Sequence, residues 1–123
     1  MAFKKLRHFP EYLVIAVLAL LTACTRPIHD QSALKAIKAE ARVLMATQQT
    51  KTNEVVPESR WPRTIANLKP KEVTISSDGV YIGIKPYFDG GWGYFVSRRE
   101  GKLPEPVDRF SELGQGIYWY QPY

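Results

Sequence analysis

Cys24 is the residue of this chain with the clearest chemistry. A thiolate is a strong nucleophile, so this side chain can accept a covalent group. The sequence of 123 residues contains no second cysteine, which excludes an intramolecular disulfide. In an exported protein a lone thiol is an oxidation liability unless it is modified. We therefore expect Cys24 to be an attachment site and not a catalyst.

The sequence has too few histidines and cysteines for the common catalytic and metal-binding sites. Apart from His8, the only histidine is His29, which lies five residues after Cys24. Ser-His-Asp and Cys-His sites are therefore incomplete unless His29 folds back, and zinc sites need several His or Cys ligands. Gly90-Gly91-x-Gly93 follows a predicted turn and opens a predicted strand, which is the wrong context for a phosphate-binding loop. We predict no catalytic residue, no metal site, no cofactor other than a covalent lipid, and no enzymatic activity.

Carboxylates leave one enzymatic alternative open. A cell-wall-acting glycosidase would need two carboxyl groups at a defined separation. Asp78 and Asp89 fall in predicted turns, where acidic side chains are usually only solvated. A long predicted loop over residues 98–116 contains four more acids, Glu100, Glu105, Asp108 and Glu112. Carboxylate-based hydrolysis is therefore an alternative and not the expected function.

Aromatic residues in the last third of the chain suggest a binding surface. They can form the core of a sheet, because strands favour aromatics, or an exposed platform for sugar rings or a partner's apolar residues. Side chains alternate along a strand, so burial of Trp119 with Ile117 would leave Tyr118 and Tyr120 exposed. The candidate partner-binding residues are Trp92, Tyr94, Tyr118 and Tyr120.

The first 24 residues have the three zones of a secretory signal. Lys4, Lys5 and Arg7 precede an apolar run over 12–21, and small residues follow it. A membrane-spanning helix needs about 20 apolar residues, so this run is too short to span a bilayer and is typical of a signal-peptide core. We predict that residues 1–23 are a cleaved signal peptide.

Leu21-Thr22-Ala23-Cys24 resembles the lipobox of bacterial lipoproteins. The resemblance implies a diacylglyceryl thioether on Cys24, cleavage between Ala23 and Cys24, and acylation of the new amino terminus. Two or three acyl chains anchor a protein stably, whereas one binds only marginally. Thr25, and not Asp, follows the cysteine, and by resemblance to enterobacterial sorting signals this favours the outer membrane, facing the periplasm, over the inner membrane. The alternative is a plain signal peptide that leaves Cys24 as a free thiol.

The chain after the cysteine predicts two helices and a short sheet. Apolar residues at helical spacing predict a helix over 30–48 that Asp30 or Ser32 caps, either packed on its own domain or acting as a stalk or partner-binding helix. A polar linker follows, and Trp61-Pro62 begins a second helix that Pro70 ends. From there an alternating pattern predicts strands over 72–76, 80–85, 92–97 and 117–121, with a turn at Ser77-Asp78-Gly79.

The expected fold class is α+β, a small antiparallel sheet of three or four strands covered by one or two helices. We expect a lipidated tether, helix and linker over 24–58 and the α+β domain over 59–123. The last 63 residues also resemble a recurring family of small bacterial proteins of uncharacterised function, through Trp61-Pro62, Gly79-Val80-Tyr81-Ile82, Gly93-Tyr94-Phe95-Val96 and Gly116-Ile117-Tyr118-Trp119-Tyr120. These marks are turn glycines and core residues, so the resemblance implies a fold and no site residues.

Charge and composition narrow the function. The chain has 17 basic and 12 acidic residues, but the basic residues are spread out, and a nucleic-acid footprint is usually denser. We expect a non-enzymatic envelope lipoprotein that binds the membrane through its lipid and an envelope protein or cell-wall material through its domain. An immunity-type or inhibitor lipoprotein that blocks an incoming toxin is the second alternative.

The lipid anchor predicts a labelling result. Metabolic labelling with a palmitate analogue should tag the wild-type chain and leave Cys24→Ala unlabelled, because the thiol accepts the lipid. Equal labelling of the two chains would contradict the anchor.

Overall fold

The computed structural model describes residues 27–48, 52–86 and 91–122. The predicted signal peptide, Ala23 and Cys24 lie outside these residues, as do Asp89 and Tyr123. Within the described part, no helix is long and apolar enough to cross a membrane.

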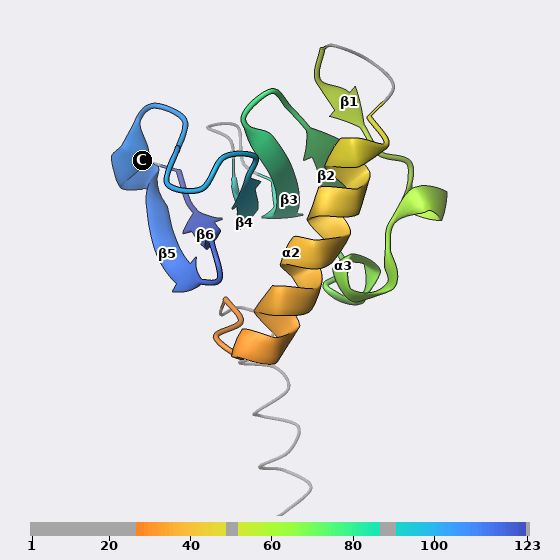
Figure 1. Ribbon diagram of the computed structural model, residues 1–123, viewed down its shortest axis with the longest axis horizontal. Coiled ribbons are helices and arrows are strands. Elements are labelled where there is room, and N and C mark those ends of the chain that lie inside the picture. Colours follow the sequence, from red (N-terminus) through yellow and green to blue (C-terminus); the bar gives the residue numbers. More distant parts are fainter. Residues whose placement is uncertain (1–26, 49–51, 87–90, 123) are drawn as a thin grey trace, which may run out of the picture.

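One antiparallel sheet of six strands forms the centre of the molecule (Figure 1). In space the strands follow the order β1-β2-β3-β4-β6-β5. Their bounds are β1 Glu54–Val55, β2 Glu72–Ile75, β3 Gly79–Lys85, β4 Trp92–Ser97, β5 Phe110–Gly114 and β6 Ile117–Tyr120. The helices are α2 Gln31–Ala46 and α3 Arg63–Asn67, with short 3₁₀ turns η1 Glu58–Arg60 and η2 Val107–Arg109. The α+β class is confirmed, with more strands than expected.

The two additional strands lie at the two edges of the sheet. β5 falls within the predicted loop over 98–116 and pairs with β6 through the tight turn at Gln115 and Gly116. β1 falls within the predicted linker and has only two residues, which pair with β2. Neither segment shows a run of alternating apolar residues in the sequence. In the structure only Leu113 of β5 is buried, and Val55 of β1 is 62% exposed.

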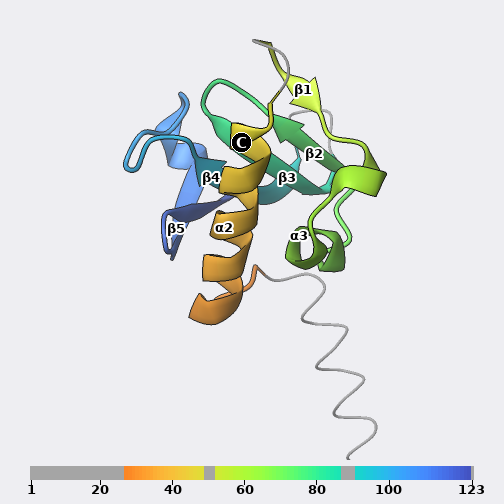
Figure 2. The same ribbon diagram turned by 45° about the vertical axis from the view of Figure 1, so that its right-hand side comes forward.

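α2 crosses one face of the sheet, as Figures 1 and 2 show. Asp30 is its N-cap, because its carboxylate accepts a hydrogen bond from the backbone N–H of Ser32 at 3.3 Å. The apolar side of the helix is buried in the predicted pattern, at Leu34, Ile37, Ala41 and Leu44. The helix is therefore packed on its own domain.

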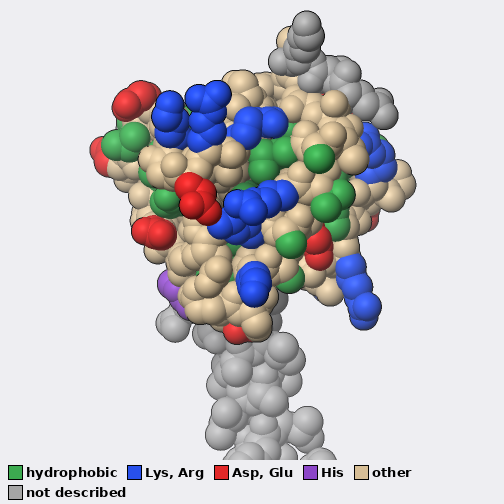
Figure 3. All heavy atoms as spheres, in the orientation of Figure 1, with side chains coloured by type: hydrophobic (Ala, Val, Ile, Leu, Met, Phe, Trp, Pro, Cys, Tyr) green, Lys and Arg blue, Asp and Glu red, His purple; other side chains and the backbone are tan. Residues whose placement is uncertain are grey.

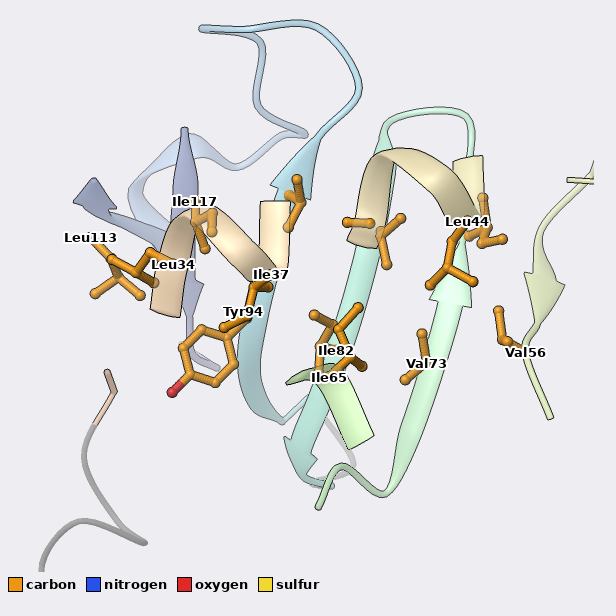
Figure 4. Packing of buried hydrophobic residues seen from close by; sticks show 14 residues of the cluster. Leu34, Ile37, Leu44, Val56, Ile65, Val73, Ile82, Tyr94, Leu113 and Ile117 are labelled. Carbon is orange, nitrogen blue, oxygen red and sulfur yellow. The ribbon is translucent and has the colours of Figure 1, made fainter. Parts of the chain in front are cut away.

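The core lies between α2 and the strands beneath it. Figure 4 shows Ile37, Ile65, Ile82 and Tyr94 gathered between the helix and the sheet. β1 and α2 contribute to the same sheet and the same core as the later strands. The folded unit therefore begins before residue 59, where we had expected the domain to start.

Glu40 of α2 fixes the position of α3. Its carboxylate accepts hydrogen bonds from the backbone N–H groups of Thr64 at 3.1 Å and Ile65 at 3.0 Å, near the start of α3. These N–H groups have no partner within the helix, so the carboxylate satisfies them and favours the positive end of the helix dipole. Pro62 precedes the first helical residue, in agreement with the prediction.

The first described residues are attached to the core. The backbone N–H of Ile28 donates a hydrogen bond to the Tyr94 hydroxyl at 3.0 Å. Tyr94 is only 3% exposed, and its hydroxyl points away from the buried cluster (Figure 4). The chain is therefore bound to the sheet two residues before Asp30 caps α2.

The packing of α2 predicts a difference between two truncations on the same helix. Ile37→Ala should lower the free energy of unfolding by about 3 kcal/mol, because it leaves a cavity in the core. Val43→Ala should change it by less than about 0.5 kcal/mol, because Val43 is 61% exposed. Urea unfolding followed by circular dichroism measures both, and equal losses would contradict the burial of this face of the helix.

Candidate functional site

The sheet has a second face, which α2 does not cover. Strand alternation places Ile117 and Trp119 toward α2 and Tyr118 and Tyr120 on the opposite face, as predicted. The register sets Tyr81 of β3 beside Phe95 of β4 on that same face.

Aromatic rings form a cluster on this opposite face. Phe95 is completely buried, and its ring centroid lies 4.7 Å from that of Tyr81 and 5.3 Å from that of Phe110. Tyr120 closes the cluster, 5.5 Å from Tyr81 in an edge-on arrangement and 6.3 Å from Phe110. Edge-on and tilted ring pairs of this kind are favourable, so these rings form a second, smaller apolar cluster.

The four candidate binding aromatics have different environments. Tyr94 is core, because it is 3% exposed beneath α2 and packs edge-on against Trp119 at 5.1 Å. Tyr120 was expected to be exposed and is 5% exposed, so that expectation is wrong. Trp92 and Tyr118 are half-buried, and the Lys85 ammonium lies 5.4 Å from the Trp92 ring centroid. These four residues therefore do not form a flat row of exposed rings.

Two glycines explain why Tyr120 is buried. Gly83 of β3 pairs with Gly93 of β4, and Gly93 pairs in turn with Tyr120 of β6. A Cβ atom on Gly93 would lie 2.8 Å from the Tyr120 hydroxyl and would also clash with the carbonyl oxygen of Ile82. The absence of side chains here lets Tyr120 lie across the strands toward Gly83, whose Cβ would be 3.5 Å from the same hydroxyl.

A pocket of about 150 Å³ opens beside the Tyr120 hydroxyl. We call it the tyrosine pocket. It is lined by residues of β2, β3 and β6 and their ends, namely Lys71, Glu72, Thr74, Tyr81, Gly83, Lys85, Pro86 and Tyr120.

The chemistry of the tyrosine pocket is rich in hydrogen-bond donors. Tyr120 contributes its hydroxyl to the lining, and burial raises the pKa of Tyr120 to about 12, so the hydroxyl stays protonated at neutral pH. Lys71 and Lys85 add two exposed ammonium groups. The one carboxylate, on Glu72, already accepts a hydrogen bond from the Thr74 hydroxyl at 3.0 Å.

A second pocket, of about 310 Å³, lies where the turn after β2 meets the segment after β4. It is lined by Ser77, Asp78, Arg98, Arg99, Lys102 and Leu103. Arg98 has a structural role, because its guanidinium donates to the Gln48 side chain at 2.8 Å and to the Ser76 carbonyl at 3.0 Å. The Ser97 hydroxyl holds the following turn by donating to the carbonyls of Arg99 and Lys102.

The other acidic candidates do not converge. Glu100, which follows β4, forms ion pairs with two residues of α2, Lys38 at 2.9 Å and Arg42 at 3.7 Å. The hydrogen bond from the Lys38 ammonium lowers the pKa of this carboxyl. Figure 3 shows basic side chains gathered on this side of the molecule with acidic ones beside them. Three other acids of the predicted loop, Glu105, Asp108 and Glu112, are exposed. Among the described residues, no three His, Cys, Asp or Glu side chains group as a metal site would require.

The chain was compared with protein-family models, with curated proteins and with solved structures, and it matches none of them.

Sequence reasoning identified Tyr120 but not the rest of the tyrosine pocket. Lys71, Thr74 and Lys85 looked like ordinary polar residues of strands and their ends. The signal that could have revealed the pocket is a glycine inside each of two adjacent predicted strands, Gly83 and Gly93. Such glycines mark places where another group approaches the backbone closely.

The buried phenol predicts a loss of stability in alkali. The unfolded chain ionises Tyr120 near its ordinary pKa of 10.0, whereas the folded chain does so at about 12. The contribution of Tyr120 is therefore complete below about pH 10, and the free energy of unfolding falls as the pH rises from about 10 to about 12.

Tyr120→Phe should make this fall shallower. It should not abolish the fall, because burial also raises the pKa of Tyr81, Tyr94 and Tyr118. Urea unfolding at several pH values across this range measures the slope, with the exposed Val43→Ala, which removes no titrating group, as the control. An unchanged slope in Tyr120→Phe would show that this phenol is not desolvated.

Proposed function

We propose that this protein is a bacterial envelope lipoprotein whose domain is a non-enzymatic binding module. The observation that carries the proposal is the lipobox-type sequence ending at Cys24, which stands directly before a folded domain. The described fold starts at Pro27, and Ile28 is already bonded to the core. A covalent lipid on Cys24 would hold the domain at the membrane through a very short tether, with the outer membrane as the proposed site.

The arrangement of acids favours binding over hydrolysis. Among the described residues, Glu72 is the one carboxylate that lines the tyrosine pocket, and Asp78 is the one that lines the second pocket, beside Arg98 and Arg99. Hydrolysis of glycans by paired carboxylates needs two in one site. Glu40 and Glu100 are engaged by other parts of the fold, in a helix cap and in ion pairs.

The donor groups of the tyrosine pocket support a binding role. The Tyr120 hydroxyl can donate a hydrogen bond into the pocket, so a ligand with an acceptor at that position would gain this bond. The proposed ligands are cell-wall material or another component of the envelope. A toxin-blocking role would instead use a protein-sized surface, and no described feature favours it.

Fractionation of cells tests the proposal. The wild-type chain should sediment with the envelope, resist extraction by high salt and dissolve in detergent, because acyl chains hold it. Cys24→Ala should appear in the salt-soluble exported fraction. Thr25→Ser, which leaves the cysteine in place, is the matched control and should behave as the wild type. Envelope association of Cys24→Ala equal to that of the wild type would overturn the anchor.

A further inference from the structure

We infer that the tyrosine pocket binds an anionic group, a carboxylate or a phosphate, carried on a body no larger than one sugar ring. This inference deepens the binding part of the proposed function and does not depend on the lipid anchor. It rests on three properties of the pocket, namely its hydroxyl donor, its charge and its size.

The donor is the hydroxyl of Tyr120. Tyr120 is 5% exposed and lines the pocket, and its hydroxyl lies 3.5 Å from where a Cβ of Gly83, another lining residue, would be. Gly83 and Gly93 leave the space that brings this hydroxyl to the pocket, so its position is set by the backbones of two strands. A hydrogen bond to a charged acceptor is about twice as strong as one between neutral groups, and an anion therefore gains most from this donor.

The charge of the pocket also favours an anionic ligand. Lys71, the residue before β2, and Lys85, the last residue of β3, both line it. Glu72 partly offsets them, but its carboxylate already accepts from the Thr74 hydroxyl. The described lining residues thus offer more donors than acceptors, and two lysines and one glutamate give them a net charge of one positive unit. The two ammonium groups would repel a cationic ligand.

The size of the pocket limits the ligand. About 150 Å³ is below the range of roughly 300–1,000 Å³ typical of sites for larger small molecules. A single ring with its acidic substituent fits this space. Tyr81 is half-buried, so part of its ring can pack against the apolar C–H face of a sugar, while its other side rests on Phe95 at 4.7 Å between centroids.

Ligand-detected NMR on the full chain in detergent tests the inference. The probes are glucuronate, glucose 6-phosphate and uncharged glucose. Either anionic probe, or both, should bind saturably, and glucose should bind at least about tenfold more weakly. The two anionic arms distinguish a carboxylate from a phosphate ligand.

Variants separate the tyrosine pocket from the rest of the surface. Tyr120→Phe keeps the ring and removes the hydroxyl, and it should weaken binding of the anionic probe about tenfold. Tyr118→Phe removes a hydroxyl from the same face of the same strand outside the pocket and should bind as the wild type. Lys85→Gln should weaken the anionic probes and leave the weak binding of glucose unchanged.

Three results would overturn the inference. The first is that no probe binds saturably, the second is that glucose binds as tightly as the anions, and the third is that Tyr120→Phe binds as tightly as the wild type. A circular dichroism melt of each variant shows whether it is folded before binding is compared. Failure here would leave the fractionation result for Cys24 unaffected, so the two proposals can fail separately.

Discussion

The packing of α2 against one face of the sheet is the interaction on which the rest of the structure depends. Leu34 and Ile37 are completely buried, and burial of such a side chain contributes about 1.5–3 kcal/mol. Ala41, which is also completely buried, keeps the helix close to the strands. The same helix presents Glu40 to the start of α3, so displacement of α2 would remove both the core packing and this cap.

Because α2 covers only one face of the sheet, apolar residues on the opposite face must be shielded from water by other side chains. It has no helix of its own among the described elements, and its apolar cluster is built from rings that cross the strands. Phe95 is completely buried in this way, and Tyr120 lies over the glycine pair. The rings do not cover the whole face, and the tyrosine pocket lies at their margin. The pocket is thus a consequence of how the uncovered face was filled.

The sequence predicted what local patterns determine. The helix expected over 30–48 is found at Gln31–Ala46, the turn at Ser77-Asp78-Gly79 joins β2 to β3, and the side-chain alternation of β6 is as expected. Helical periodicity, turn chemistry and strand alternation each depend on residues close together in the chain, so one sequence contains the information.

What the sequence did not predict depends on contacts between distant segments. β1 is too short to show a period, and β5 carries Ser111 and Glu112 on an exposed edge, so neither looks like a strand alone. The burial of Tyr120 is decided by Gly93, which lies 27 positions earlier and becomes its neighbour only through strand pairing. The lining of the tyrosine pocket comes from three strands for the same reason.

If Cys24 carries the proposed lipid, the hydrogen bond from Ile28 to Tyr94 limits how far the domain can stand from the membrane. Four residue steps separate Ile28 from Cys24, and a fully extended chain covers roughly 14 Å over that distance. A domain anchored there would stay within about its own thickness of the bilayer and could not cross a wide gap to a distant target. It would search for ligands by diffusing in the plane of the membrane, and it would meet only those that come close to the lipid surface.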